Sequence, residues 1–343
     1  KNQMKCRWYC MRYERKSEYG GYLPLELNSG TEMFERYSKY LKRFNSVKAS
    51  FQYIIEQEKP LKIMIPYYYC PSTTEALKQS GVDISFYHIS SDLCPEKIPD
   101  EKENLILLVD YFGVKTEDIS RIAKQYEKAA VIIDYAHSFF AEPIFQKNIY
   151  NVYSARKFFG VPDGSYVVAE GISISTPELA NSCAYAGYLL KAYECGVNAA
   201  YHEKKAADQI IAEQYTGMSK LTVGLLKNVD YENVKNRRIK NYRVLHQELG
   251  NINELLIPQE CPAYQYPLLI SDHGEKIKSE LVKKKIFVST LWKGKELLKK
   301  GNEFEINMSD NAVFLPIDQR YDEEDMRFLA NTVLEMRKNI AYG

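Results

Sequence analysis

The chain has 343 residues, and 45% of them are hydrophobic, which is enough to fill a sizeable core and excludes disorder as the main state. Lys and Arg number 46 against 45 Asp and Glu, so the net charge of +1 provides no general basic field for nucleic acid or an anionic membrane. Apolar runs span only a few residues, far short of the roughly 20 that a helix needs to cross a bilayer.

Short apolar runs alternate with amphipathic stretches through the first half of the chain. The runs predicted to be strands cover residues 62–65, 84–89, 105–109 and 131–133. The stretches predicted to be helices cover residues 72–79, 117–126 and 177–192. Continuous apolar runs are typical of strands buried on both faces, as in a parallel sheet. The alternation of strand and helix therefore predicts an α/β fold.

The second half predicts a long helix over residues 219–249, strands over 262–270 and 286–290, and a closing helix over 321–338. These elements suggest a smaller α+β unit. We therefore predict two domains, a large one over residues 1–234 with an N-terminal arm and a small one over 235–343.

The cysteines favour a reducing compartment, since there are seven of them, an odd number, with no CxxC pair. Cys6 and Cys10 lie four residues apart without a second pair or a His cluster, so we expect no metal site. The first residues are charged throughout and do not resemble a signal peptide. We therefore expect a cytoplasmic protein.

Several common functional motifs do not occur. The sequence contains no GxxxxGK[ST], no GxGxxG after a strand, no HExxH and no GxSxG. The absence of these motifs disfavours a P-loop nucleotide-binding site, a Rossmann dinucleotide site, a zinc protease and an α/β-hydrolase.

The run 131–133 ends in Asp134, and His137 follows three residues later. In α/β sheets, ligands bind outside the carboxyl ends of the strands. Asp134 is therefore either a ligand group or the N-cap of a following helix.

Lys157 is followed by Phe158 and Phe159. Aromatic neighbours can desolvate its amine and make it a nucleophile, although a surface lysine with a buried stem is the common alternative. Residues 65–72, IPYYYCPS, end a strand and begin a helix. Their tyrosines either stack on a planar cofactor or pack in the core.

An aromatic turn, an Asp at a strand end and a Lys 23 residues later form a pattern that resembles the fold-type I pyridoxal phosphate (PLP) enzymes. The resemblance is specifically to the DegT/StrS-type sugar aminotransferases and covers nearly the whole chain. The matching segments are residues 19–23 (YGGYL), 44–51 (FNSVKASF), 65–73, 110–113 (DYFG), 134–137 (DYAH), Lys157, 217–221 with 236–238, 291–292 and 315–317.

The resemblance implies a large domain with a mostly parallel seven-stranded sheet between helices and a small C-terminal α+β domain. It implies that Lys157 forms the Schiff base with PLP, that Asp134 pairs with the pyridine nitrogen, and that His137 orients these groups. The further cofactor-binding residues that it implies are Ser154, Lys48, Ala49, Tyr69 and Cys70. Tyr22 and Arg156 are the implied substrate-binding residues.

The chain departs from the family pattern around the phosphate and the ring. Val47 and Lys48 stand where the family has Gly-Thr, and Val152 stands where it has a Ser, with Ser154 nearby. The family's stacking aromatic aligns with Cys70, so Tyr69 or Tyr68 is expected to take its place. Two residues that the family's partner subunit contributes align with Tyr215 and Gly217. These changes indicate a divergent branch.

The resemblance implies transfer of an amino group from an amino acid to a nucleotide-linked keto sugar, in surface polysaccharide or amino-sugar biosynthesis. The resemblance also implies a homodimer with shared active sites. Two alternatives stay open: a PLP enzyme of another reaction type, and a non-catalytic scaffold. Dehydrating relatives carry His at the Lys157 position, which disfavours that reaction here.

Overall fold

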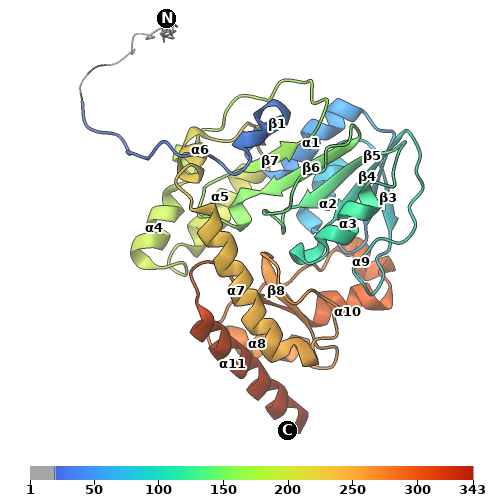
Figure 1. The fold of residues 1–343 in the computed structure, drawn as a ribbon, viewed down its shortest axis with the longest axis vertical. Helices are drawn as coiled ribbons and strands as arrows, with labels where there is room; N and C mark the ends of the chain where they lie inside the picture. Colours follow the sequence, from blue (N-terminus) through green and yellow to red (C-terminus); the bar gives the residue numbers. More distant parts are fainter. Residues whose placement is uncertain (1–18, 20, 343) are drawn as a thin grey trace, which may run out of the picture.

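The computed structural model describes Tyr19 and residues 21–342. Cys6 and Cys10 lie outside the described residues, and so does Gly20 of the loop predicted over residues 19–23. Within the described part, seven strands form one sheet in the order β1-β7-β6-β5-β4-β2-β3 (Figure 1). Their bounds are β1 Leu41–Phe44, β2 Lys62–Pro66, β3 Asp83–Tyr87, β4 Asn104–Val109, β5 Ala130–Tyr135, β6 Ile149–Ser154 and β7 Ser165–Val168.

The sheet is mostly parallel, as predicted. Only β7 runs against its neighbours, since it pairs antiparallel with both β1 and β6. Every residue of β4, β5 and β6 is buried, as expected for strands covered on both faces. The carboxyl ends of β4 and β5 therefore meet at one edge of a well-packed core.

Helices surround this sheet and build the remainder of the chain (Figure 1). Their bounds are α1 Val47–Glu58, α2 Pro71–Gln79, α3 Thr116–Ala123, α4 Gly187–Cys195, α5 Tyr201–Ala212, α6 Lys220–Leu226, α7 Tyr231–Leu249, α8 Gly274–Lys283, α9 Lys295–Lys300, α10 Glu303–Asn311 and α11 Glu323–Tyr342. Five short 3₁₀ segments are η1 Glu35–Tyr40, η2 Tyr111–Gly113, η3 Ala155–Lys157, η4 Ser182–Ala184 and η5 Gly250–Ile252. Helix α1 packs on β6 and β7, and α3 packs on β4 and β5. None of the helices in the described part is long and apolar enough to span a membrane.

The predicted helix over residues 219–249 is wrong as a single element, because it divides into α6 and α7. Ser219 caps α6 by accepting a hydrogen bond from the Thr222 amide, and Asp230 caps α7 by accepting one from the Asn233 amide. Two good N-caps eleven residues apart start two helices. The predicted domain boundary at residues 234 and 235 falls inside α7, which packs on both β8 and α11.

Two other predicted elements also differ. The predicted helix over 177–192 begins only at Gly187, because Leu179 forms a bridge with Gly217 instead. The predicted strand over 286–290 is reduced to one bridge between Ser289 and Phe314.

The C-terminal part carries a second sheet of two antiparallel strands, β8 Gln265–Leu269 and β9 Ala312–Pro316. All of β8 and most of β9 is buried. Helices α8 and α10 pack on β9 or on each other, and α11 packs on α7 and α8. This unit lies beside the carboxyl edge of the large sheet (Figure 1).

Candidate active site

Two strand ends and one short turn bring the predicted catalytic residues together. Asp134 lies near the end of β5, and His137 follows in the turn after that strand. Strand β6 runs beside β5 and leads directly into η3, which ends at Lys157. Parallel neighbours end at the same edge of a sheet, so the three side chains lie around one point.

Asp134 is only 6% exposed, and each of its carboxylate oxygens accepts one hydrogen bond. The Tyr69 hydroxyl donates to Oδ2 at 2.6 Å, and the Ala136 amide donates to Oδ1 at 2.9 Å. Burial raises the pKa of Asp134, and the two hydrogen bonds together with Lys157 oppose that rise. Asp134 does not cap a helix, because η2, η3 and α3 begin elsewhere. The helix-cap interpretation therefore does not apply.

Lys157 Nζ lies 3.0 Å from His137 Nε2. Burial and the charge of Lys157 hold the pKa of His137 well below its usual value, so its imidazole is neutral. A lysine ammonium can only donate, so Nε2 accepts and Nδ1 carries the ring hydrogen. Nδ1 is buried and has no hydrogen-bond partner within the described residues. The histidine therefore holds the amine and keeps one donor free.

Aromatic rings enclose the imidazole of His137 on both sides. The Tyr264 ring stacks at 4.9 Å with an interplanar angle of 18°, and the Trp292 ring stacks at 5.5 Å with an angle of 17°. Lys157 Nζ also lies 5.0 Å from the centroid of Tyr264. These rings fix the orientation of the histidine, and Tyr264 shields one side of the half-buried lysine side chain.

A small cavity of about 70 Å³ lies against these groups. The residues that line it are Val47, Tyr69, Cys70, Thr73, Val109, Asp110, Asp134, Ala136, His137, Lys157 and Trp292. Lys157 also lines a much wider cavity of about 570 Å³ on its other side. Lys157 thus lines both a small cavity and a wide one.

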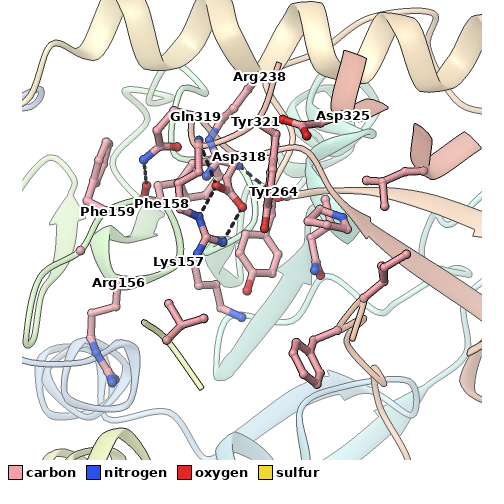
Figure 2. Close-up of a pocket in the computed structure, with 18 of the residues that line it drawn as sticks. Arg156, Lys157, Phe158, Phe159, Arg238, Tyr264, Asp318, Gln319, Tyr321 and Asp325 are labelled. Atoms are coloured by element: carbon pink, nitrogen blue, oxygen red, sulfur yellow. Dashed lines mark hydrogen bonds and ion pairs between the residues drawn. The ribbon is translucent and has the colours of Figure 1, made fainter. Parts of the chain in front are cut away.

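Figure 2 shows the wider cavity, where Arg156, Lys157, Phe158 and Phe159 face residues of the C-terminal part. The guanidinium of Arg238 lies 4.4 Å above the ring of Phe158 and donates from one nitrogen to the carbonyls of Ala263 and Tyr264. Burial lowers the pKa of Arg238 to about 10.

Residues of the C-terminal part also hold η3, the short turn that carries Lys157, and the Phe158 that follows it. Gln319 donates to the Phe158 carbonyl at 2.8 Å (Figure 2). Gln319 and Arg238 thus fix the turn that carries Lys157 against the C-terminal unit.

The other predicted site residues are dispersed. Arg156 lines the wide cavity and forms an ion pair with Asp208 of α5. Lys48 lines a separate groove between α1 and α2. Ser154 and Ala49 are buried, although neither lines the small cavity. Tyr22 is 94% exposed and is not among the residues lining either cavity.

Tyr69 and Cys70 both reach the small cavity, in different ways. The Tyr69 ring meets Trp292 edge to face at 5.8 Å, while its hydroxyl is committed to Asp134. The Tyr68 hydroxyl donates to the Leu291 carbonyl, so Tyr68 ties two distant segments together. Cys70 lines the cavity with a thiol in place of a ring.

The sequence prediction missed two residues of this site. Asp110 follows β4 and accepts hydrogen bonds from Ser138 and Thr116, and burial raises its pKa to about 6. Its position at a strand end, like that of Asp134, was a usable signal. Trp292 belongs to the matching segment 291–292, but the resemblance placed that segment in the small domain and did not assign Trp292 to the site.

The donor set fits pyridoxal phosphate. Asp134 provides a buried carboxylate, Lys157 an amine with no carboxylate partner in the described part of the chain, and His137 a buried unpartnered N–H. The N-terminus of α1 lies beside the same cavity through Val47. A helix N-terminus favours a phosphate, although the side chains of this segment differ from a Gly-Thr pair.

No family model and no curated protein matches the chain. Solved structures do match. Spr1654 of Streptococcus pneumoniae in its PLP form, described as a sugar aminotransferase, is 14% identical with a TM-score of 0.64, covering 92% of this chain and 93% of its own. A DegT DnrJ EryC1 StrS aminotransferase of Brucella abortus is 15% identical with a TM-score of 0.61, covering 88% and 87%. DesI, solved with its TDP-sugar product, is 13% identical with a TM-score of 0.61, covering 90% and 85%. These likenesses confirm the fold predicted from the sequence.

Proposed function

We propose that the protein is a PLP-dependent aminotransferase that moves an amino group from an amino acid to a keto sugar. The observation that carries this proposal is the meeting of Asp134, His137 and Lys157 at the carboxyl edge of the sheet. The fold shared with sugar aminotransferases, including one in a PLP form, supports it.

Asp134, His137 and Lys157 would hold the cofactor, together with Tyr69, Cys70 and the start of α1. When bound, PLP supplies a carbonyl that reacts with amines and a ring that accepts electrons. The Asp134 carboxylate holds a proton at the ring nitrogen by its charge. The Lys157 amine would join the cofactor carbonyl with loss of water when no substrate is present, and would otherwise carry the proton that the substrate carbon gives up. Neutral His137 accepts from that amine and keeps it aimed into the cavity.

The wide cavity supports a large, anionic substrate. Arg156 and Arg320 line it with their carboxylate partners Asp208 and Asp318 nearby, and Arg238 and Lys285 add two further cations without an ion-pair partner among the described residues. Its volume of about 570 Å³ falls within the range of roughly 300–1,000 Å³ for small-molecule sites. We infer a nucleotide-linked keto sugar, as the TDP-sugar in DesI suggests. This substrate places the reaction in amino-sugar or surface polysaccharide biosynthesis.

The cofactor proposal is tested by adding PLP, reducing with borohydride and mapping the labelled peptide. We expect the label on Lys157 and none in Lys157→Ala. Lys278→Met is the matched control, because Lys278 is also largely buried and lies on α8. A label on another lysine would refute the assignment.

One observation favours the scaffold alternative, since the cavity of about 70 Å³ leaves little room beside Asp134. A wild-type chain that stays colourless in excess PLP would establish that alternative. The substrate class has its own test, in which amino-nucleotide sugars are run in the reverse direction. If simple amino acids aminate the bound cofactor and no amino sugar does, a small-amine substrate replaces the sugar.

We also propose a homodimer. Exposed apolar side chains gather on the α4–α5 hairpin, where Leu190, Tyr193, Val197 and Tyr201 are all exposed. A second copy is the simplest cover for such a surface. An active monomer at nanomolar concentration in sedimentation experiments would contradict this.

The five cysteines within the described residues are free, which supports a cytoplasmic location.

A further inference from the structure

A short segment of the C-terminal part, residues 290–294, lies across the small cavity. It has no helix or strand and connects the bridge at Ser289 to α9. The Tyr68 hydroxyl donates to the Leu291 carbonyl, and an added Cβ at Gly294 would lie 3.6 Å from Pro71. The segment therefore rests on the aromatic turn that precedes α2.

Trp292 is the residue of this segment that reaches the cavity, and it is 9% exposed. Its ring stacks on His137 and meets Tyr69 edge to face. Tyr68 and Phe112 lie at 5.5 and 6.4 Å from it. Among the described residues that line the cavity, Trp292 alone comes from beyond position 157.

The cavity volume left beside Trp292 shows whether a cofactor ring can enter while the indole stays in place. The cavity holds about 70 Å³, whereas sites for small organic ligands hold roughly 300–1,000 Å³. The space beside Asp134 and Lys157 is thus too small for a phosphorylated pyridine ring until a lining group moves. Trp292 is the largest lining side chain and lies on irregular backbone, whereas Asp134 lies on a central strand and Tyr69 on a buried turn.

Ion pairs flank this segment. Lys293 pairs with Asp310 at 2.7 Å, and their side chains are 43% and 39% exposed. Lys78 pairs with Glu296 at 3.0 Å at the other end, and both of these side chains are half-buried. Ion pairs so accessible to water contribute little, so the segment is held mainly by the hydrogen bond from Tyr68 to the Leu291 carbonyl and by the packing of the indole.

We propose that Trp292 is the aromatic cover of the cofactor site. The indole fills the site when it is empty, moves out for PLP to enter, and then lies against the bound ring. The inference rests on the proposed cofactor. It also explains how position 70 can be Cys, because the aromatic surface comes from the C-terminal part of the chain.

The test follows PLP binding to the full-length apo protein by stopped flow, using visible absorbance as the signal. Trp292→Ala is expected to raise both the association and the dissociation rate at least tenfold. Phe287→Ala is the matched control, because Phe287 lines only the wide cavity and is expected to leave both rates unchanged.

A second measurement keeps the native indole and does not depend on the folding of a variant at position 292. The sequence has two tryptophans, and Trp8 lies outside the described residues. In Trp8→Phe, the Trp292 emission is expected to change at the same rate as PLP absorbance and to stay protected from acrylamide in the loaded protein.

Normal covalent labelling of Lys157 with unchanged rates in Trp292→Ala would overturn this proposal alone. An acrylamide-accessible Trp292 in the loaded protein would do the same. No PLP binding by the wild-type chain would overturn the proposed function together with it.

Discussion

Replacing Tyr69 with Phe removes the hydroxyl that donates to Asp134 at 2.6 Å and keeps the ring that meets Trp292. The pKa of Tyr69 lies well above its usual value, so the hydroxyl is a donor at every pH at which the protein folds. The variant therefore tests how the apo protein keeps a buried carboxylate charged.

The loss of free energy of unfolding expected for Tyr69→Phe depends on whether the lost hydrogen bond went to a charged or a neutral group. A bond to a charged group contributes about 1.5–3 kcal/mol and a neutral one about 0.5–1.5 kcal/mol. The folded-state pKa of Asp134 is above its usual value, so the native state binds more protons than the unfolded state, and stability is lost as pH rises through the folded-state pKa. The hydroxyl bonds to the charged form of Asp134, so its loss raises that pKa further.

Urea unfolding of the apo protein measures this effect at two pH values. We expect Tyr69→Phe to lower the free energy of unfolding by about 2 kcal/mol near pH 8 and by about 1 kcal/mol near pH 5. Tyr68→Phe is the control, because the Tyr68 hydroxyl donates to a neutral carbonyl and its loss should be independent of pH.

Equal losses for the two variants at both pH values would refute the reasoning. The same conclusion would follow if Tyr69→Phe kept its full effect in an Asp134→Asn background. In that background no charge remains for the hydroxyl to stabilise, so Tyr69→Phe should cost less than in the wild-type chain, and the cycle should give a non-zero coupling energy between the two positions.

Three further predictions concern stability. Burial raises the pKa of Asp110 to about 6, so its contribution to the free energy of unfolding should fall by on the order of 3 kcal/mol as pH rises from about 4 to above 6; in urea titrations, Asp110→Asn should make the loss of stability over this pH range smaller by that amount. Leu107→Ala empties a fully packed position in β4 and should lower the free energy of unfolding by about 2–5 kcal/mol, measured by urea denaturation; under 1 kcal/mol would contradict the packing. Asn302→Ala breaks the capping box with Glu305 and should lower the thermal midpoint through a loss of about 0.5–2 kcal/mol.

Strands β4 and β5 were predictable because their apolar runs are continuous and buried on both faces, and β2 was predictable from its apolar run although one of its faces is only half-buried. Strand β6 escaped prediction because polar and aromatic residues interrupt it. Its Asn151 is fully buried, and the side chain bonds to Ile144 and Val168. Polarity in a core strand is tolerated when every polar atom has a partner, and the sequence does not reveal such partners.

The site, like the sheet, contains residues that the sequence predicted and residues that it did not. Asp134, His137 and Lys157 were predicted because they follow adjacent strand ends within a short stretch of sequence. Lys48 was expected beside them, but its side chain lines a groove between α1 and α2. On α1 the side chains of neighbouring positions diverge, so Val47 lines the cavity and Lys48 points elsewhere.

The distance along the chain between Lys157 and Trp292 has a consequence for synthesis on the ribosome. The seven-stranded sheet is complete at Val168, but the residue that closes its carboxyl edge follows more than a hundred residues later. At about 5–20 residues per second, a nascent chain exposes this edge for several seconds or longer. Asp134 and the surrounding tyrosines are then uncovered, so cofactor captured during translation would meet an open site.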